Sequence, residues 1–154
     1  MNKQKITPFL WFDNQAEEAV NFYISVFKNA KILNIDKMPD GKYMVATFEL
    51  EGQRFSAING GPVFKFNEAI SMSVDCKDQE EVDYFWNKLT ADGGAESQCG
   101  WLKDKYGMSW QIVPRRLMEL MGDKDPAKAK RVMDEMLKMK KIIVKDLEGA
   151  ADNK

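Results

Sequence analysis

The stretch DNQAEEAVNFY, residues 13–23, has a near copy at residues 75–86, which read DCKDQEEVDYFW. From Glu17 onward the two stretches align at a constant spacing, so that Glu17 matches Glu80 and Phe22 matches Phe85. Each stretch follows a short apolar run and continues with apolar residues at helical spacing, which predicts a strand followed by a helix. The repeat indicates one supersecondary unit used twice, with a shared concavity where a ligand could sit.

Both predicted helices carry a start signal. Asn14 lies three residues before Glu17, and Asp78 lies three residues before Glu81. This spacing is typical of a capping side chain and the carboxylate that completes the first turn. The glutamates beside them invite an acid/base interpretation, but adjacent residues diverge around a helix axis, which favours capping and solvation.

Alternating apolar residues between turn signals predict three strands after each helix. The strands that we expect are 6–12, 31–37, 42–50 and 53–59 in the first half, and 69–75, 96–99, 101–103 and 109–113 in the second. Each half therefore has the order β-α-β-β-β, and the fold class is α+β.

Composition limits the class of protein. The chain has 154 residues, which suits one globular domain, and its 23 Lys and Arg balance its 24 Asp and Glu. This balance argues against a nucleic-acid partner. The first residues turn polar too early for a signal peptide, and no apolar run approaches the roughly 20 residues of a membrane span. We expect a cytoplasmic protein with no membrane partner.

The chain contains no histidine. This excludes Ser-His-Asp and Cys-His catalysis and removes the commonest transition-metal ligand. The two cysteines, Cys76 and Cys99, have no histidine to activate them, and without an export signal we expect both to be reduced.

The stretch GWLKDKYGMSWQIVP at residues 100–114, with PFLWF at 8–12 and EEAVNFY at 17–23, resembles the vicinal oxygen chelate (glyoxalase/bleomycin-resistance) superfamily. The resemblance is closest to its PhnB-like branch, often labelled demethylubiquinone methyltransferase, and covers residues 5–148. It implies two modules, at about 5–60 and 68–114, that form a cup-shaped mixed sheet. A linker at 61–67 joins them, and a helical extension follows at 115–148. It also implies a homodimer, which could exchange modules.

The resemblance further implies a divalent metal held by His, Glu or Gln on the first and last strands of the modules. The matching positions here are Thr7, Pro8 or Phe9, then Ser56, then Ala69 or Ser71, and finally Gln111. Only Gln111 offers even a neutral oxygen donor of the usual kind, so we expect no metal. The Gly60-Gly61-Pro62 stretch is placed as a connection rather than as a nucleotide-binding turn. We therefore expect no cofactor and no genuine methyltransferase activity.

Strand alternation predicts which side chains face the concavity. Leu10, Phe12, Ile70, Met72 and Val74 are expected on the helix side. The candidate ligand-binding residues form a pocket of aromatic walls with few neutral polar groups: Trp11, Asn59, Ser73, Trp101 and Gln111. The opposing interpretation makes the tryptophans core or dimer contacts and lets Gln111 satisfy a neighbouring backbone group.

The C-terminal part predicts an amphipathic helix that begins at Asp125-Pro126. Its apolar stripe, which includes Val132, Met133 and Met139, favours a dimer contact over a ligand groove. Periodicity leaves open whether residues 141–148 continue this helix or become extended.

Three functions remain open from sequence. The first is a metal-free module that binds a small molecule. The second is an enzyme of the superfamily that acts on an unidentified substrate, and the third is a structural dimer without a ligand. The sequence identifies neither the ligand nor a reaction.

Overall fold

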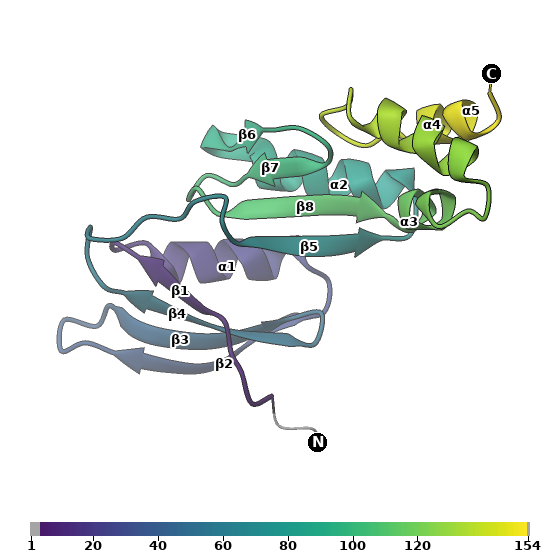
Figure 1. Cartoon of the computed structure of the whole chain (residues 1–154). Coiled ribbons are helices and arrows are strands. Elements are labelled where there is room, and N and C mark those ends of the chain that lie inside the picture. The colour runs from purple at the N-terminus through teal and green to yellow at the C-terminus, as the bar shows by residue number, and fades with distance from the viewer. Residues whose placement is uncertain (1–3, 154) are drawn as a thin grey trace. The chain divides into compact units, whose positions relative to one another are not determined.

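The computed structural model describes residues 4–153 and divides the chain into two compact units, with the boundary along the chain between Phe66 and Asn67. Residues 1–3, where the argument against a signal peptide begins, lie outside the described residues. Each unit contains one four-stranded mixed sheet and helices, as the predicted α+β class with a helical C-terminal part requires. Figure 1 shows the elements of each unit.

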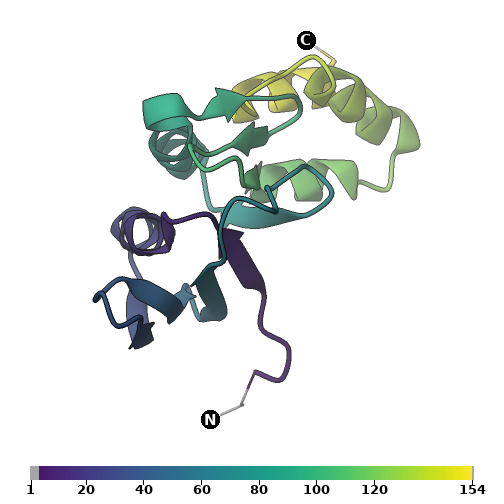
Figure 2. The same ribbon diagram turned by 90° about the vertical axis from the view of Figure 1, so that its left-hand side faces the viewer.

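The first unit has the predicted order β-α-β-β-β. Its elements are β1 (Phe9–Phe12), α1 (Ala16–Val26), β2 (Ala30–Lys37), β3 (Tyr43–Leu50) and β4 (Gln53–Asn59). The strands are ordered β1-β4-β3-β2, with β1 parallel to β4 and the other neighbours antiparallel. Helix α1 covers one face of this sheet (Figure 2), where Leu10 and Phe12 are buried as predicted.

Strand β1 begins at Phe9, three residues later than the sequence predicts. The side chain of Gln4 replaces the missing strand pairing. Its amide nitrogen donates to Arg54 O at 2.9 Å, and its amide oxygen accepts from Arg54 N at 3.0 Å. The backbone N–H and C=O groups of Arg54 are therefore hydrogen-bonded by a side chain, where pairing with a neighbouring strand was expected.

The prediction that Asn14 caps the first helix is wrong. The N-cap residue is Gln15, and it makes no capping bond with its side chain. Instead, Asn59 Oδ1 at the end of β4 accepts from Ala16 N at 2.8 Å. Asn59, distant in sequence, therefore caps the helix in place of the predicted Asn14. A helix start needs a hydrogen-bond acceptor near its free N–H groups, whichever part of the chain supplies it.

The second unit repeats the order with shorter hairpin strands. Its elements are β5 (Ser71–Cys76), α2 (Gln79–Thr90), a short 3₁₀ turn (Ala91–Gly93), β6 (Ala95–Glu96), β7 (Trp101–Lys103) and β8 (Ser109–Pro114). The strand order is β5-β8-β7-β6, with β5 parallel to β8. Here the cap prediction is confirmed, since the Asp78 side chain accepts from Glu81 N at 2.9 Å.

The helix side of the second sheet holds Leu102, Trp110 and Ile112, all buried. The predicted place of Ile70 on this side is wrong, because Ile70 precedes β5 and its side chain is 60% exposed. Strand β6 is Ala95–Glu96, so only Glu96 of the predicted strand 96–99 belongs to it, and the chain turns at Cys99 and Gly100.

Three helices form the C-terminal extension: α3 (Arg115–Met121), α4 (Pro126–Met136) and α5 (Val144–Ala151). Helix α4 begins as predicted, with Asp125 as its cap. Residues 137–143 separate α4 from α5. Residues 141–148 neither continue α4 nor form one extended segment, because Ile143 is extended and residues 144–148 belong to α5.

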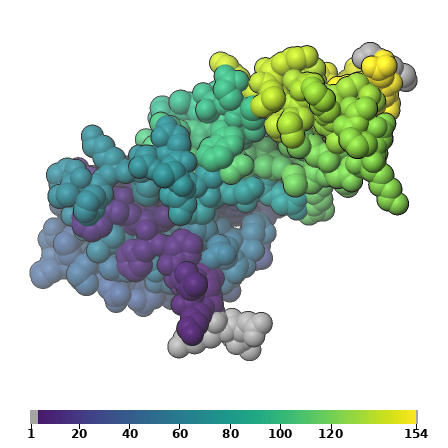
Figure 3. All heavy atoms as spheres, in the orientation of Figure 1, coloured from purple at the N-terminus to yellow at the C-terminus, as the bar shows by residue number. Residues whose placement is uncertain are grey.

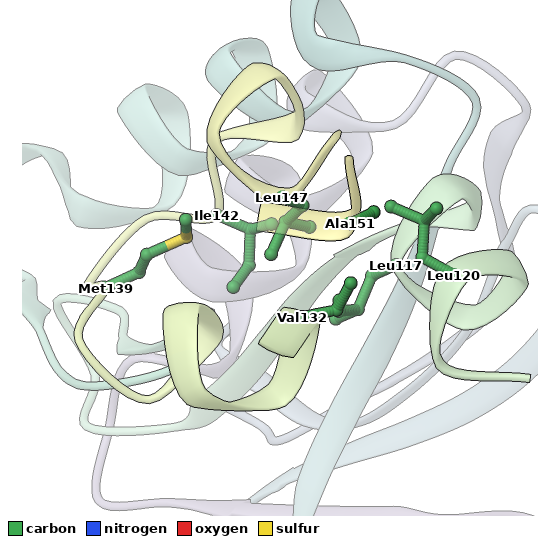
Figure 4. Packing of buried hydrophobic residues seen from close by; sticks show 7 residues of the cluster. All are labelled: Leu117, Leu120, Val132, Met139, Ile142, Leu147 and Ala151. Carbon is green, nitrogen blue, oxygen red and sulfur yellow. The ribbon is translucent and has the colours of Figure 1, made fainter. Parts of the chain in front are cut away.

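The extension has its own apolar core, drawn in Figure 4. Val132 and Met139 of the predicted stripe are buried there, whereas Met133 is 42% exposed. Figure 3 shows the green-to-yellow atoms of the extension packed into a continuous mass. The cluster consists of Leu117, Leu120, Val132, Met139, Ile142, Leu147 and Ala151.

Among residues 4–153, no helix is long and apolar enough to cross a membrane.

Candidate functional site

Three of the five candidate residues form one row across the second sheet. Ser73 of β5 is paired in register with Gln111 of β8, and Gln111 is paired with Trp101 of β7. Residues paired across strands point to the same face of a sheet. The face is the one opposite the buried Leu102 and Ile112, and we call it the polar face of the second unit.

Gln111 lies at the centre of this row. Its amide nitrogen donates to Ser71 Oγ at 2.9 Å, so the side chain is bound to a neighbouring side chain rather than to backbone. Within residues 4–153, no hydrogen bond to its amide oxygen is found. An acceptor oxygen therefore remains for a ligand, beside the half-buried indole of Trp101.

Ser109 adds a buried hydroxyl to the polar face, and sequence reasoning missed it. Register places Ser109 between Ser71 and Lys103, one row from Gln111. Its side chain is 1% exposed, and Oγ has no hydrogen-bond partner among the described residues. Buried polar groups are almost always paired, so this hydroxyl has unused capacity. The alternating Ser-x-Gln of β8 was the signal that could have identified it.

Two exposed ion pairs border the polar face. Lys103 pairs with Glu68, and this contact lowers the pKa of the Glu68 carboxyl. Asp75 pairs with Arg115 at 2.7 Å, which raises the pKa of the guanidinium. Exposed pairs add little stability. They do, however, compensate the charges at these borders, and the side chains of the central row are themselves uncharged.

Trp11, on the first unit, is held by the predicted linker. Its indole nitrogen donates to Gly61 O at 2.9 Å, and Phe64 packs edge-on with ring centroids 5.0 Å apart. A Cβ atom at Gly60 would overlap the indole ring, so only glycine fits there. The glycines of residues 60–61 therefore serve the packing of Trp11.

Asn59 also uses its polar atoms within the first unit. Its oxygen caps α1 at Ala16, and its nitrogen donates to Tyr43 O at 2.9 Å. These bonds give Asn59 a structural role. The roles of Asn59 and Trp11 in ligand binding stay predictions, as do those of the three residues on the second unit.

The register shows which side chains stand at the expected metal positions of each unit. Ser56 is paired with Phe9 in the first unit, as expected, whereas in the second unit Gln111 is paired with Ser73 rather than with the expected Ala69 or Ser71. Ser56 is buried, and its hydroxyl lies 3.3 Å from Thr47 Oγ1. A phenyl ring, two hydroxyls and one amide do not fit a divalent ion that needs anionic or imidazole donors. Among residues 4–153, no cluster of three or more His, Cys, Asp or Glu could hold a metal.

Asp104 connects several residues of the stretch 100–114 through hydrogen bonds. The carboxylate is 2% exposed and accepts hydrogen bonds from Tyr106 N, Met108 N and Trp110 Nε1, at 2.9, 3.1 and 2.9 Å. Asp104 closes the turn between β7 and β8 and holds the buried indole of Trp110 on the opposite side of the sheet from the polar face. The spacing of an aspartate before Tyr106-Gly107 was the available signal.

The two cysteines are free, and they differ in environment. Burial, followed by the carboxylates of Glu81, Asp75 and Asp78, raises the pKa of the Cys76 thiol to about 12. Cys76 is therefore protonated at neutral pH and is a poor nucleophile. Cys99 is only partly buried.

Comparison with known proteins identifies the family of the chain. The family described as 3-demethylubiquinone-9 3-methyltransferase matches residues 4–113. The PhnB protein of Bacillus cereus is 39% identical, and the match covers 72% of this chain and 99% of that chain, with a TM-score of 0.68. No curated protein matches the chain.

More distant structures share the fold alone. A Pseudomonas aeruginosa protein is 17% identical over 73% of this chain and 98% of its own, with a TM-score of 0.61. The fosfomycin resistance protein FosX of Listeria monocytogenes is 14% identical over 73% of this chain and 93% of its own, with a TM-score of 0.53. The chain thus belongs to the 3-demethylubiquinone-9 3-methyltransferase family, the predicted PhnB-like branch.

Proposed function

We propose that this protein binds a small, partly apolar molecule on the polar face of its second unit, without a bound metal. The observation that carries the proposal is the row formed by Ser73, Gln111 and Trp101. It combines a flat aromatic surface with neutral donors and acceptors, the composition typical of a small-molecule site.

The groups on this face favour an uncharged ligand region. Gln111 offers an amide oxygen, Ser73 an exposed hydroxyl, and Ser109 a buried hydroxyl without a partner among the described residues. Ligand hydroxyl, amide or carbonyl groups would match the accessible groups of Gln111 and Ser73, and Trp101 would cover an apolar part of the molecule. The nearby charges of Lys103 and Arg115 are already paired with carboxylates.

Native mass spectrometry of the purified protein tests the proposal. We expect a retained small molecule in the wild type and about tenfold lower occupancy in Gln111→Ala, because a charge-neutral hydrogen bond and its orientation are lost. Gln53→Ala is the matched control, since Gln53 is exposed on β4 of the other unit. Equal occupancy in Gln111→Ala and Gln53→Ala would exclude this face as the site.

We propose that the family label does not describe methyl transfer by this chain. The glycine backbone that could contact a methyl donor is already engaged: Gly60 N donates to Phe12 O at 2.8 Å, and Gly61 N to Asp13 O at 3.1 Å. Calorimetric titration with S-adenosylmethionine should give no heat of binding. Micromolar affinity would overturn this part of the proposal.

The metal-free part has its own test. Because the donor set of Ser56, Ser73 and Gln111 is neutral, Mn²⁺, Ni²⁺ and Zn²⁺ should each fail to bind stoichiometrically in calorimetry. One tightly bound ion per chain would favour the alternative, an enzyme of the superfamily with metal chemistry.

We also propose that the protein is a homodimer, and an exchange of modules between the two copies is compatible with the division into two units. The exposed apolar side chains of Phe9, Phe64 and Met133 support an interface. Sedimentation equilibrium should give twice the mass of one chain. A monomer at micromolar concentration would contradict it.

A further inference from the structure

The loop between α4 and α5 is bound to the turn that precedes β7. Cys99 N donates to Met139 O at 2.8 Å, and Gly100 N donates to Lys140 O at 2.7 Å. We call residues 139–144 the strap. They lie outside the part of the chain that matches the family, which ends at residue 113.

The turn held by the strap is conformationally costly. Cys99 and Gly100 have φ angles of 55° and 84°, both in the left-handed region. A non-glycine residue adopts this region at a cost, so Cys99 needs support from its surroundings. The contact is also close: a Cβ atom at Gly100 would lie 3.1 Å from Ile142 Cγ1 and 3.0 Å from Ile112 O.

Gln79 fixes the strap from its other side. At the start of α2, its amide nitrogen donates to Ile142 O at 3.1 Å, and its amide oxygen accepts from Val144 N at 2.8 Å. The same nitrogen lies 3.0 Å from Asp83 Oδ1, which also binds Lys141 at 2.7 Å. One neutral amide thus satisfies a donor and an acceptor of the strap backbone, which neither a carboxylate nor an ammonium could do.

The turn leads directly into the polar face. Gly100 O accepts from Ile112 N at 2.8 Å, and the next residue is Trp101, whose N donates to Gln98 O at 3.0 Å. Trp101 is paired with Gln111 in the row described above. A shift of the turn would therefore displace Trp101 relative to Gln111.

We propose that the strap sets the position of Trp101 on the polar face and that Gln79 is the positioning residue that holds the strap. The extension thereby contributes to binding without contacting the ligand. The statement about binding rests on the proposed function, whereas the coupling of Gln79 to Trp101 does not.

Gln79→Ala and the control Glu80→Ala test the coupling. Glu80 lies in the same helical turn and is exposed. In Gln79→Ala we expect amide exchange at Cys99 and Gly100, followed by NMR, to accelerate about tenfold, since two hydrogen bonds to the strap are lost. In protein labelled with 5-fluorotryptophan, the ¹⁹F resonance of Trp101, assigned through Trp101→Phe, should shift while that of Trp11 does not.

Each outcome decides the inference. Exchange at Cys99 and Gly100 equal to that of Glu80→Ala overturns it, and so does an unchanged Trp101 resonance. If Gln79→Ala fails to fold, Gln79→Glu serves instead: it keeps an acceptor for Val144 N but loses the donor to Ile142 O. A smaller shift of the Trp101 resonance is expected there, and no shift again overturns the coupling.

Native mass spectrometry separates this inference from the proposed function. If the wild type retains a small molecule, its occupancy should fall about tenfold in Gln79→Ala and stay unchanged in Glu80→Ala. Unchanged occupancy in Gln79→Ala would overturn the contribution to binding. A wild type that retains no molecule would count against the proposed function, while exchange and ¹⁹F data would still decide the coupling.

Discussion

The two units place different residues at the corner where the first and last strands end. In the first unit, Phe12 is paired with Asn59 at this corner, and in the second, Cys76 is paired with Pro114. Asn59 caps α1, the helix that follows β1. Pro114 at the matching corner has no side-chain acceptor, and Asp78 caps α2 in the second unit. The same helix start is thus reached by a distant side chain in one copy and by a local one in the other.

The same contrast extends to the polar groups on the sheets. The first unit uses Trp11 and Asn59 within its own packing. Buried Arg54 Nε in the first unit and buried Ser109 Oγ in the second have no hydrogen-bond partner among the described residues, and only the second unit has a helical extension. The two copies of the backbone therefore use the polar side chains at these positions differently.

The largest expected difference between the units concerns the turn before the last strand. Asp104→Ala removes a buried carboxylate that accepts three hydrogen bonds and leaves their donors unpaired. We expect a loss of roughly 3–5 kcal/mol in the free energy of unfolding. Urea unfolding measures it, with Asp40→Ala in an exposed hairpin of the first unit as the control. A loss below that of Asp40→Ala would show that the turn does not depend on Asp104.

A smaller effect is expected at the end of β4. Gly60→Ala places a methyl group where the ring of Trp11 lies, and the ring is held by Gly61 O and Phe64. Displacing it should cost about 1–3 kcal/mol in the free energy of unfolding. Gly149→Ala is the matched control, because a Cβ atom there meets nothing within 4 Å and alanine favours the helix. Equal melting temperatures for both variants would contradict the account of Trp11.

The two helix caps should also differ. Asn59→Ala removes the cap of α1 and the bond to Tyr43 O, and should cost about 2 kcal/mol, whereas Asp78→Ala removes a single exposed cap and should cost about 1 kcal/mol. Thermal unfolding of both variants gives the ranking. A larger loss for Asp78→Ala would reverse the comparison between distant and local capping.

Sequence reasoning reached the parts of this molecule that local patterns determine. The alternation and turn residues predicted both β-α-β-β-β units, and Asp78 was identified as a cap because its partner Glu81 lies three residues away. Asn59 was not identified as a cap, because its partner Ala16 is 43 residues distant. Ser73, Trp101 and Gln111 were placed on one face by alternation, and the register gives their row. The strap escaped prediction because its bonds to Cys99 and Gly100 are between backbone groups and leave no side-chain signature.

The smallest effect concerns Cys76, which takes the corner position that Phe12 occupies in the first unit. Its pKa of about 12, raised chiefly by burial, lies above that of a thiol in the unfolded chain. The folded state therefore keeps the proton where the unfolded state loses it, so the contribution of Cys76 to stability is complete below pH 9 and declines as the pH rises toward 12. The replacement Cys76→Ala should remove this part of the alkaline loss of stability, as measured by urea unfolding at pH 8 and pH 10.

Iodoacetamide at pH 8 should modify Cys99, which is partly exposed, faster than Cys76 in the folded protein. Comparable rates for the two thiols would mean that the corner opens readily, and that cysteine does not replace phenylalanine there as a packed apolar residue.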